Sequence, residues 1–301
     1  MKKTLAFLII FLLFSIIIIP STVGIIDKTT TITIPGFRGY IQDLIDDASP
    51  GDTIYIPSGT YYENIVIDKS INLIGEDRDT TIIDGGGSGT VVFILADRVT
   101  VCGFTIQNSG DGYNDVGMGI NSNSNTITGN TISNNYYWGI FIFVSFSYNN
   151  ITGNTISNNE FGITIGSFSN YNTITGNTIS NNENGIHAYW ASLNNTIYHN
   201  NFINNGENAQ DESKNTWDDG KYGNYWDDYK ERYPKARKKP FKGIWDTPYE
   251  IPEGDNKDNY PLINQWSKSK PRTITRNMVT FNSLFYWFLE RFPILRVFLY
   301  L

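Results

Sequence analysis

Single apolar side chains recur at a fixed spacing through the middle of the chain, each flanked by Asn and Thr. One set of equivalent positions, separated by 24, 23 and 23 residues, is Ile127, Ile151, Ile174 and Ile197. A second set with the same spacing is Ile132, Ile156, Ile179 and Phe202. No apolar stripe at i, i+3 and i+4 accompanies them, so paired helices are disfavoured. Because Ile and Thr favour strands whereas Asn and Gly favour turns, each repeat predicts short strands joined by tight corners.

A unit of this length cannot bury its own apolar face, so the repeats must stack on one another. Stacking at the strand spacing of about 4.8 Å places equivalent residues above each other, with the Ile columns in the core. The Asn side chains then lie at corners, where they bond the backbone and one another. The Asn columns are 125, 149, 172 and 195; 130, 154, 177 and 200; 134, 158, 181 and 204; and 135, 159, 182 and 205. We predict an all-β, single-stranded, right-handed parallel β-helix over 25–206, with its regular coils at 118–205. The alternative, a leucine-rich horseshoe, needs a Leu signature that the repeat lacks.

The segment before the regular repeats predicts a cap and further coils. Within YIQDLIDDA (40–48), Ile41, Leu44 and Ile45 share one helical face, which predicts a short helix covering the N-terminal end of the stack. Gly75 follows an apolar strand in the same way as the corner glycines of the repeats. Strands are expected at 53–56, 64–67, 70–74, 80–84, 90–95 and 99–106.

Both ends of the chain depart from the repeat. Residues 207–266 lose the period and are rich in Trp and Tyr, which predicts an irregular aromatic cap over the C-terminal end. Residues 267–301 are interpreted as a linker and an apolar tail, 281–301. Its interspersed charges make a membrane-spanning helix costly, so we predict contact with a membrane surface or another chain, or packing back on the solenoid. Residues 1–24 predict a signal peptide or an uncleaved signal anchor, and so a secreted or cell-surface protein.

The repeated phrase N-x-I-x-x-N-x-I-x-x-N…G-I resembles the β-helix repeat of NosD-like proteins, also called carbohydrate-binding and sugar-hydrolysis repeats. Residues 46–76 resemble the opening of that domain. The segments GNYWDDY (223–229), DTPYEIP (246–252) and DNYPLI (258–263) resemble its closing part. The resemblance covers roughly 40–265. It implies a pectate-lyase-like solenoid and an exported protein, and it leaves the function open because one fold hosts many functions.

The family name implies copper, which prefers His, Cys and Met ligands. The donors available here are His187, His199, Cys102, Met118 and Met278. Even if the two histidines approach each other, two isolated His make a poor site, so we expect no copper site and no cofactor. Related proteins often carry an Asp/Gly-rich stretch before the DTPY motif, where this chain has the basic ERYPKARKKPFKGIW (231–245). This departure argues against a calcium site in that stretch, and calcium elsewhere in the chain is left open.

The charge and the cysteine content of the chain limit the classes of partner and the kinds of site it can have. The 301 residues carry a formal net charge of −7 with a pI near 4.9, which argues against nucleic acid as a partner. Cys102 is the only cysteine, so an intramolecular disulfide and a Cys-based zinc site are excluded. In the pattern VTVCGFTI we predict that this thiol is buried in the core.

Few acidic residues lie in the regular coils. Glu160 and Glu183 occupy equivalent positions 23 residues apart, so their backbones would stack about 5 Å apart. A retaining glycosidase needs two carboxyl groups at a comparable separation, which makes them candidate catalytic residues. The alternative, which we favour, is that both are solvated turn residues. No Arg or Lys lies between Arg98 and Lys214, which argues against an Arg-dependent lyase site.

Many aromatic residues lie outside the Ile columns. If exposed on a flat sheet, they would stack on sugar rings; otherwise alternate members such as Phe141 and Phe143 point inward. The candidate carbohydrate-binding residues are Tyr137, Trp138, Phe161, Tyr189 and Trp190. The leading hypothesis is an exported protein that binds a polysaccharide or envelope glycan without catalysis. The alternatives are a polysaccharide hydrolase or lyase and a structural or adhesion protein of the cell surface.

Overall fold

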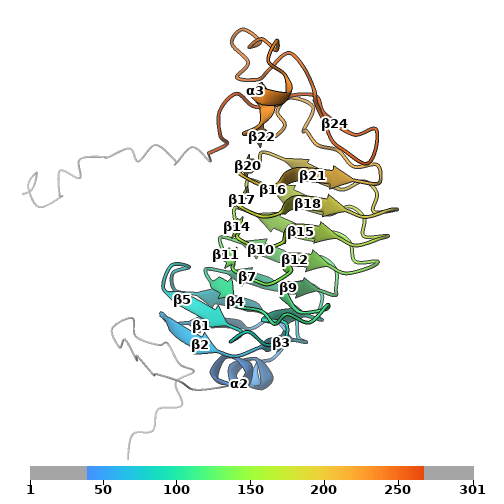
Figure 1. The fold of residues 1–301 in the computed structure, drawn as a ribbon. Helices are drawn as coiled ribbons and strands as arrows, with labels where there is room; N and C mark the ends of the chain where they lie inside the picture. The colour runs from blue at the N-terminus through green and yellow to red at the C-terminus, as the bar shows by residue number, and fades with distance from the viewer. Residues whose placement is uncertain (1–38, 268–301) are drawn as a thin grey trace, which may run out of the picture.

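The computed structural model describes residues 39–267, which form a parallel β-solenoid with three sheets running along one axis (Figure 1). The first sheet contains, in spatial order, β1 (Thr53–Ile56), β4 (Asn72–Gly75), β7 (Thr100–Cys102), β10 (Thr126–Thr128), β13 (Asn150–Thr152), β16 (Thr173–Thr175) and β19 (Thr196–Tyr198). The second contains β2 (Gly59–Tyr62), β5 (Thr81–Asp84), β8 (Thr105–Gln107), β11 (Thr131–Ser133), β14 (Thr155–Ser157), β17 (Thr178–Ser180), β20 (Asn201–Ile203) and β22 (Tyr225–Trp226). The third contains β3 (Ile65–Ile67), β6 (Val92–Ile94), β9 (Val116–Ile120), β12 (Trp138–Ile142), β15 (Phe161–Ile165), β18 (Asn184–Ala188) and β21 (Glu207–Asp211). The predicted right-handed parallel β-helix is confirmed.

The core consists of the predicted Ile columns. Ile127, Ile151 and Ile174 pair in register across the first sheet, and each is fully buried. The second set is equally buried, and a third column, which lies outside the repeated Asn-Thr-Ile phrase, runs along the third sheet. Its members are Met118, Ile140, Ile163, Ile186 and Ala209.

Three of the four Asn columns form buried hydrogen-bond ladders. The Asn177 backbone N–H and side-chain amide both donate to Oδ1 of Asn200, each at 3.0 Å, and Asn154 donates to Asn177 in the same way. The same pattern links the members of the columns that begin at Asn125 and Asn135. The fourth column is exposed and left-handed, with φ of 53–57° at Asn134, Asn158, Asn181 and Asn204. Asn therefore serves as a buried bonding group at three corners and as a tolerant αL residue at the fourth.

The predicted N-terminal cap is present as α2 (Tyr40–Asp47), which buries Ile41 and Ile45. The N-cap residue of α2, Gly39, has no side chain that could accept hydrogen bonds from the first turn of the helix. The Glu63 carboxylate accepts the free N–H groups of Ile41 and Gln42 instead, at 3.0 and 3.1 Å.

The expected early strands are found with two differences. The segment predicted at 99–106 is split into β7 and β8, because Gly103 takes φ of 82° and turns a corner. The strand β2 was not predicted, since its sequence GTYY contributes no residue to the buried core.

The stacking continues past residue 206, where the repeat spacing ends: β21 pairs with β18, and β22 pairs with β20. Beyond it lie the short helix α3 (Tyr229–Arg232) and the antiparallel pair β23 (Tyr249–Glu250) and β24 (Lys257–Asp258). Aromatic rings cover the end of the core, with centroid distances of 4.3 Å for Phe202–Trp226 and 4.0 Å for Trp226–Tyr249.

The predicted signal segment 1–24 and the apolar tail 281–301 lie outside the described residues. Within residues 39–267, neither helix has the length and apolar character needed to cross a bilayer.

Two glycines, Gly162 within β15 and Gly153 at the corner after β13, separate crowding from backbone strain. A Cβ at Gly162 would lie 2.6 Å from the carbonyl oxygen of Gly185, whereas Gly153 has no atom within 4 Å of such a Cβ but takes φ of 68°. We expect Gly162→Ala to lower the unfolding free energy by about 3 kcal/mol and Gly153→Ala by about 1 kcal/mol. Chemical denaturation followed by circular dichroism measures both. Equal losses would contradict the crowding argument.

Candidate functional site

The outer surface of the third sheet carries a layer of aromatic rings, hereafter the aromatic face. It is made of Phe93, Trp138, Phe141, Phe143, Phe161, His187 and Tyr189. These rings come from β6, β12, β15 and β18 and from the residues directly following β12 and β18. Of the two alternatives left open by the sequence, the one in which Phe141 and Phe143 point inward is wrong, because Ile140 and Ile142 fill the core and leave the two Phe rings outside.

The rings of the aromatic face are in contact from one coil to the next. Phe143 stacks on Phe141 at 4.4 Å between ring centroids, and Phe141 lies 5.5 Å from Trp138. Trp138 and Phe161, paired in register on adjacent strands, are 6.2 Å apart. The path continues from Phe161 to His187 at 6.1 Å. It ends with the 4.2 Å contact between His187 and Tyr189. The path therefore crosses three successive coils along the solenoid axis.

Three polar atoms lie buried within this layer without a hydrogen-bond partner: Trp138 Nε1, Thr164 Oγ1 and His187 Nδ1. Thr164 is fully buried although its position is on the outer side of β15, between Phe141 and His187 in the register of the sheet. The other ring nitrogen, His187 Nε2, lies 3.0 Å from Oε1 of Glu212. An unpartnered buried polar atom costs about 1–3 kcal/mol, so three of them in one layer call for an explanation.

The predicted aromatic residues are divided between two places. Trp138, Phe161 and Tyr189 belong to the aromatic face, and the half-buried Tyr137 contacts Trp138 at 5.3 Å. Trp190 lies in the turn after β18, 64% exposed, with Phe168 as its ring neighbour at 5.7 Å. Burial raises the pKa of Tyr189, with smaller contributions from Tyr113 and Glu212.

The two candidate catalytic glutamates lie beside the aromatic face. Glu160 and Glu183 are exposed and directly precede β15 and β18. The N–H of Asn184 donates to the carbonyl oxygen of Glu160 at 2.8 Å, which fixes the two glutamates on adjacent coils. The predicted stacking of their backbones is thus present, while their catalytic role stays a prediction.

Sequence reasoning missed Thr164 and Glu212 and considered His187 only as a metal ligand. The available signal was the 23-residue spacing, which aligns Phe141, Thr164 and His187 in one outward column. A threonine between two ring positions of such a column is covered by its neighbours.

The copper donors do not converge within residues 39–267, where no three His, Cys, Asp or Glu side chains form a metal-binding group. His187 lies on the third sheet, whereas His199 lies at the corner between β19 and β20 and stacks on Trp266 at 3.4 Å. Met118 is buried in the core. Cys102 is half-buried, because it alternates with the inward-facing Val101, so the prediction that its thiol lies in the core is wrong. Its partial burial raises the pKa of the thiol. These residues do not fit a copper site.

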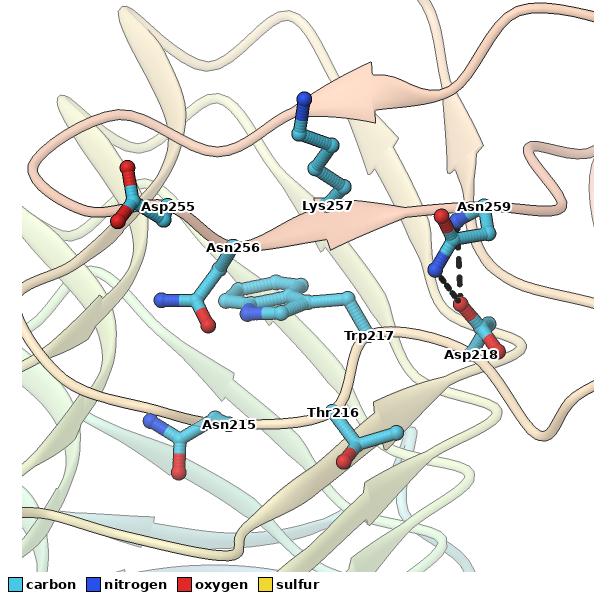
Figure 2. A pocket seen from close by; sticks show the side chains of 8 residues that line it. All are labelled: Asn215, Thr216, Trp217, Asp218, Asp255, Asn256, Lys257 and Asn259. Carbon is cyan, nitrogen blue, oxygen red and sulfur yellow. Dashed lines mark hydrogen bonds between the residues drawn. The ribbon is translucent and has the colours of Figure 1, made fainter.

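A separate polar hollow of about 360 Å³ lies in the C-terminal cap (Figure 2). It is lined by Asn215, Thr216, Trp217, Asp218, Asp255, Asn256, Lys257 and Asn259. Figure 2 shows Asp218 bonded to Asn259, whose backbone and side-chain N–H groups both donate at 3.0 Å. The Trp217 indole is fully buried and donates to Asp211 at 2.8 Å, so its bonding group is occupied within the cap.

No curated protein matches the chain. Among solved structures, ORF18 of Geobacillus virus E2 is 19% identical with a TM-score of 0.43, and the match covers 54% of this chain and 38% of that one. A pectin methylesterase mutant in complex with a hexasaccharide is 14% identical with a TM-score of 0.29, covering 59% of this chain and 70% of that one. The A-module of the Azotobacter vinelandii mannuronan C-5 epimerase AlgE6 is 14% identical with a TM-score of 0.26, covering 57% and 73%.

The family described as "Periplasmic copper-binding protein (NosD)" matches residues 45–231, which is more than half of the chain and includes every coil from β1 to β22. The match includes the repeated Asn and Ile columns and the aromatic face. The chain belongs to the NosD family.

Proposed function

We propose that this protein binds a polysaccharide through the aromatic face and does not cleave it. The observation that carries the proposal is the continuous path of rings with three unpartnered polar atoms within the same layer. Sugar rings present C–H faces that pack on aromatic rings and hydroxyl groups that both donate and accept hydrogen bonds. A bound sugar could therefore satisfy the buried atoms while covering the rings.

We further propose that the protein acts outside the cytoplasm, as a secreted or cell-surface protein facing envelope glycans. The family description, periplasmic, supports an extracytoplasmic location. A surface with few charges and many amide and hydroxyl groups suits contact with a hydrated glycan, and the net charge of −7 disfavours nucleic acid.

The test is a binding screen of the full chain against immobilised polysaccharides, with and without calcium, while reducing ends are measured in the same samples. We expect retention without new reducing ends, and Phe161→Ala should weaken retention about tenfold. Tyr148→Ala is the matched control, since Tyr148 lies in an exposed turn with Tyr171 as its ring neighbour. Retention unchanged by Phe161→Ala would reject the aromatic face, and no retention on any glycan would favour a structural surface role.

The alternative is a polysaccharide hydrolase or lyase that uses Glu160 and Glu183, which are adjacent and exposed. We expect Glu160→Gln and Glu183→Gln to leave both glycan retention and the level of reducing ends unchanged. Release of reducing ends by the unmodified chain, lost in either variant by at least about a hundredfold, would make the protein an enzyme and these residues its carboxyl pair.

A further inference from the structure

From Trp138 to Tyr189, the residues of the aromatic face lie in a stretch of sequence that contains carboxylates but neither Lys nor Arg. Between Arg98 and Lys214 the sequence contains seven carboxylates and neither Lys nor Arg. The carboxylates are Asp111, Asp115, Glu160, Glu183, Glu207, Asp211 and Glu212. Burial raises the pKa of Glu207, and Arg232 of the cap, whose guanidinium donates to the Tyr249 hydroxyl at 2.6 Å, opposes part of this rise.

A ligand that bonded the unpartnered atoms of the aromatic face would need both donors and acceptors. Trp138 Nε1 is a donor only, so it needs an oxygen acceptor. His187 Nε2 lies 3.0 Å from Oε1 of Glu212, which can only accept, so Nε2 is the donor of that pair; the other ring nitrogen, Nδ1, can bond a hydroxyl group, which both donates and accepts. The Thr164 hydroxyl can do either. Sugar hydroxyl groups meet all three requirements, whereas a carboxylate can only accept.

We infer that the aromatic face recognises an uncharged, hydroxyl-rich glycan and excludes polyuronates. This inference rests on the proposed function and names the ligand class of the same site. A uronate lying along the rings would bring its carboxylates to Glu160, Glu183 and Glu212 with no cation to balance them. Like charges at such separations disfavour binding, and the penalty grows as the ligand excludes water.

The inference also predicts that Thr164 strengthens glycan binding while it lowers the stability of the folded protein. The Thr164 hydroxyl is buried without a hydrogen-bond partner, so replacing Thr164 by the isosteric Val removes an unfavourable group. We expect Thr164→Val to raise the thermal midpoint while weakening glycan binding about tenfold. Thr152→Val is the matched control, because Thr152 lies on the outer side of β13 in the first sheet and should change neither quantity.

The experiment compares the full chain on an uncharged β-glucan, on polygalacturonate and on chitosan, at low and at high salt. We expect binding to the uncharged glucan alone, independent of salt, and reduced by Thr164→Val. Tighter binding to polygalacturonate, or binding to chitosan alone, would overturn the inference while leaving a carbohydrate-binding function intact. Thr164→Val with unchanged affinity for the glucan would overturn the role of the buried atoms. If none of the three polysaccharides binds, the inference falls, and the wider glycan screen decides whether the proposed function falls with it.

Discussion

Replacing Asn177 by Leu should lower the unfolding free energy by at least about 4 kcal/mol, because the change breaks a ladder at its centre. Asn177 is fully buried, and its Oδ1 accepts the backbone and side-chain N–H groups of Asn154 at 2.9 and 3.1 Å. Its own amide donates to the carbonyl oxygen of Ile151 at 2.9 Å. Leu would leave two buried donors and one buried acceptor unsatisfied, each costing about 1–3 kcal/mol.

The measurement is equilibrium denaturation, with Asn184→Leu as the control on the neighbouring strand β18. Asn184 is half-buried on the outside of the third sheet, and its backbone N–H donates to the carbonyl oxygen of Glu160 in the preceding coil at 2.8 Å. We expect this control to change stability by less than about 1 kcal/mol. Similar losses for the two variants would show that the ladder is not what distinguishes Asn177.

The ladders could be predicted because they follow from the repeat alone. Once equivalent positions stack in a parallel sheet, an Asn above an Asn has its donor and its acceptor at the same height in every coil, so Asn125 and Asn149 must meet. The inward Ile columns follow for the same reason. In this part of the chain, the fixed repeat length is enough to convert the sequence pattern into the positions of the residues in space.

The aromatic face was predictable only in part, because its sidedness depends on a local distortion. Trp138 and Phe141 lie on the same outer face although they are three residues apart, which simple alternation forbids. The intervening Gly139 faces the core, where a Cβ would lie 3.0 Å from Ile156, and it shifts the alternation by one residue. Nothing in the spacing of the repeats reveals that shift, so Phe141 and Phe143 could not be assigned to a face.

The sequence could not predict how the Asn ladders end, because their last acceptors come from the irregular C-terminal cap. In every ladder the donor lies in the earlier coil and the acceptor in the next, so each needs a terminal acceptor. The amide of Asn215 donates to Asp211 at 2.9 Å, and the amide of Asn208 donates to Asp228, also at 2.9 Å. The backbone N–H of Asn224 donates to Asp258 at 2.7 Å, from 34 residues away. A carboxylate only accepts, which makes it a suitable last member.

These buried carboxylates should make the protein more stable in mild acid than at alkaline pH, with Asp258 as the main contributor. Burial raises the pKa of Asp258 from 3.8 to about 7, against the lowering effect of its bonds from Asn224 and Trp226; nearby Asp218 also raises it. Between these two values the native state binds a proton that the unfolded chain releases. The unfolding free energy should therefore be highest below pH 4 to 5 as far as this group is concerned, fall as the pH rises through 7, and level off above. The full change is up to about 4 kcal/mol.

Urea denaturation at pH 5 and pH 8 measures this difference, and Asp258→Asn should remove most of it. An Asn oxygen in place of Oδ2 can still accept from Asn224 and from Trp226 Nε1, whereas the amide nitrogen in place of Oδ1 loses the bond from the Tyr260 N–H. The variant should therefore be less stable at both pH values, and the test is the change in the difference between them. Part of the pH dependence should persist, because burial also raises the pKa of Asp211 and of Asp228. Asp79→Asn, at an 81% exposed side chain, is the control for loss of one negative charge and should leave the slope unchanged. Stability that rises from pH 5 to pH 8 would show that the bonds to Asp258, rather than its burial, decide its charge.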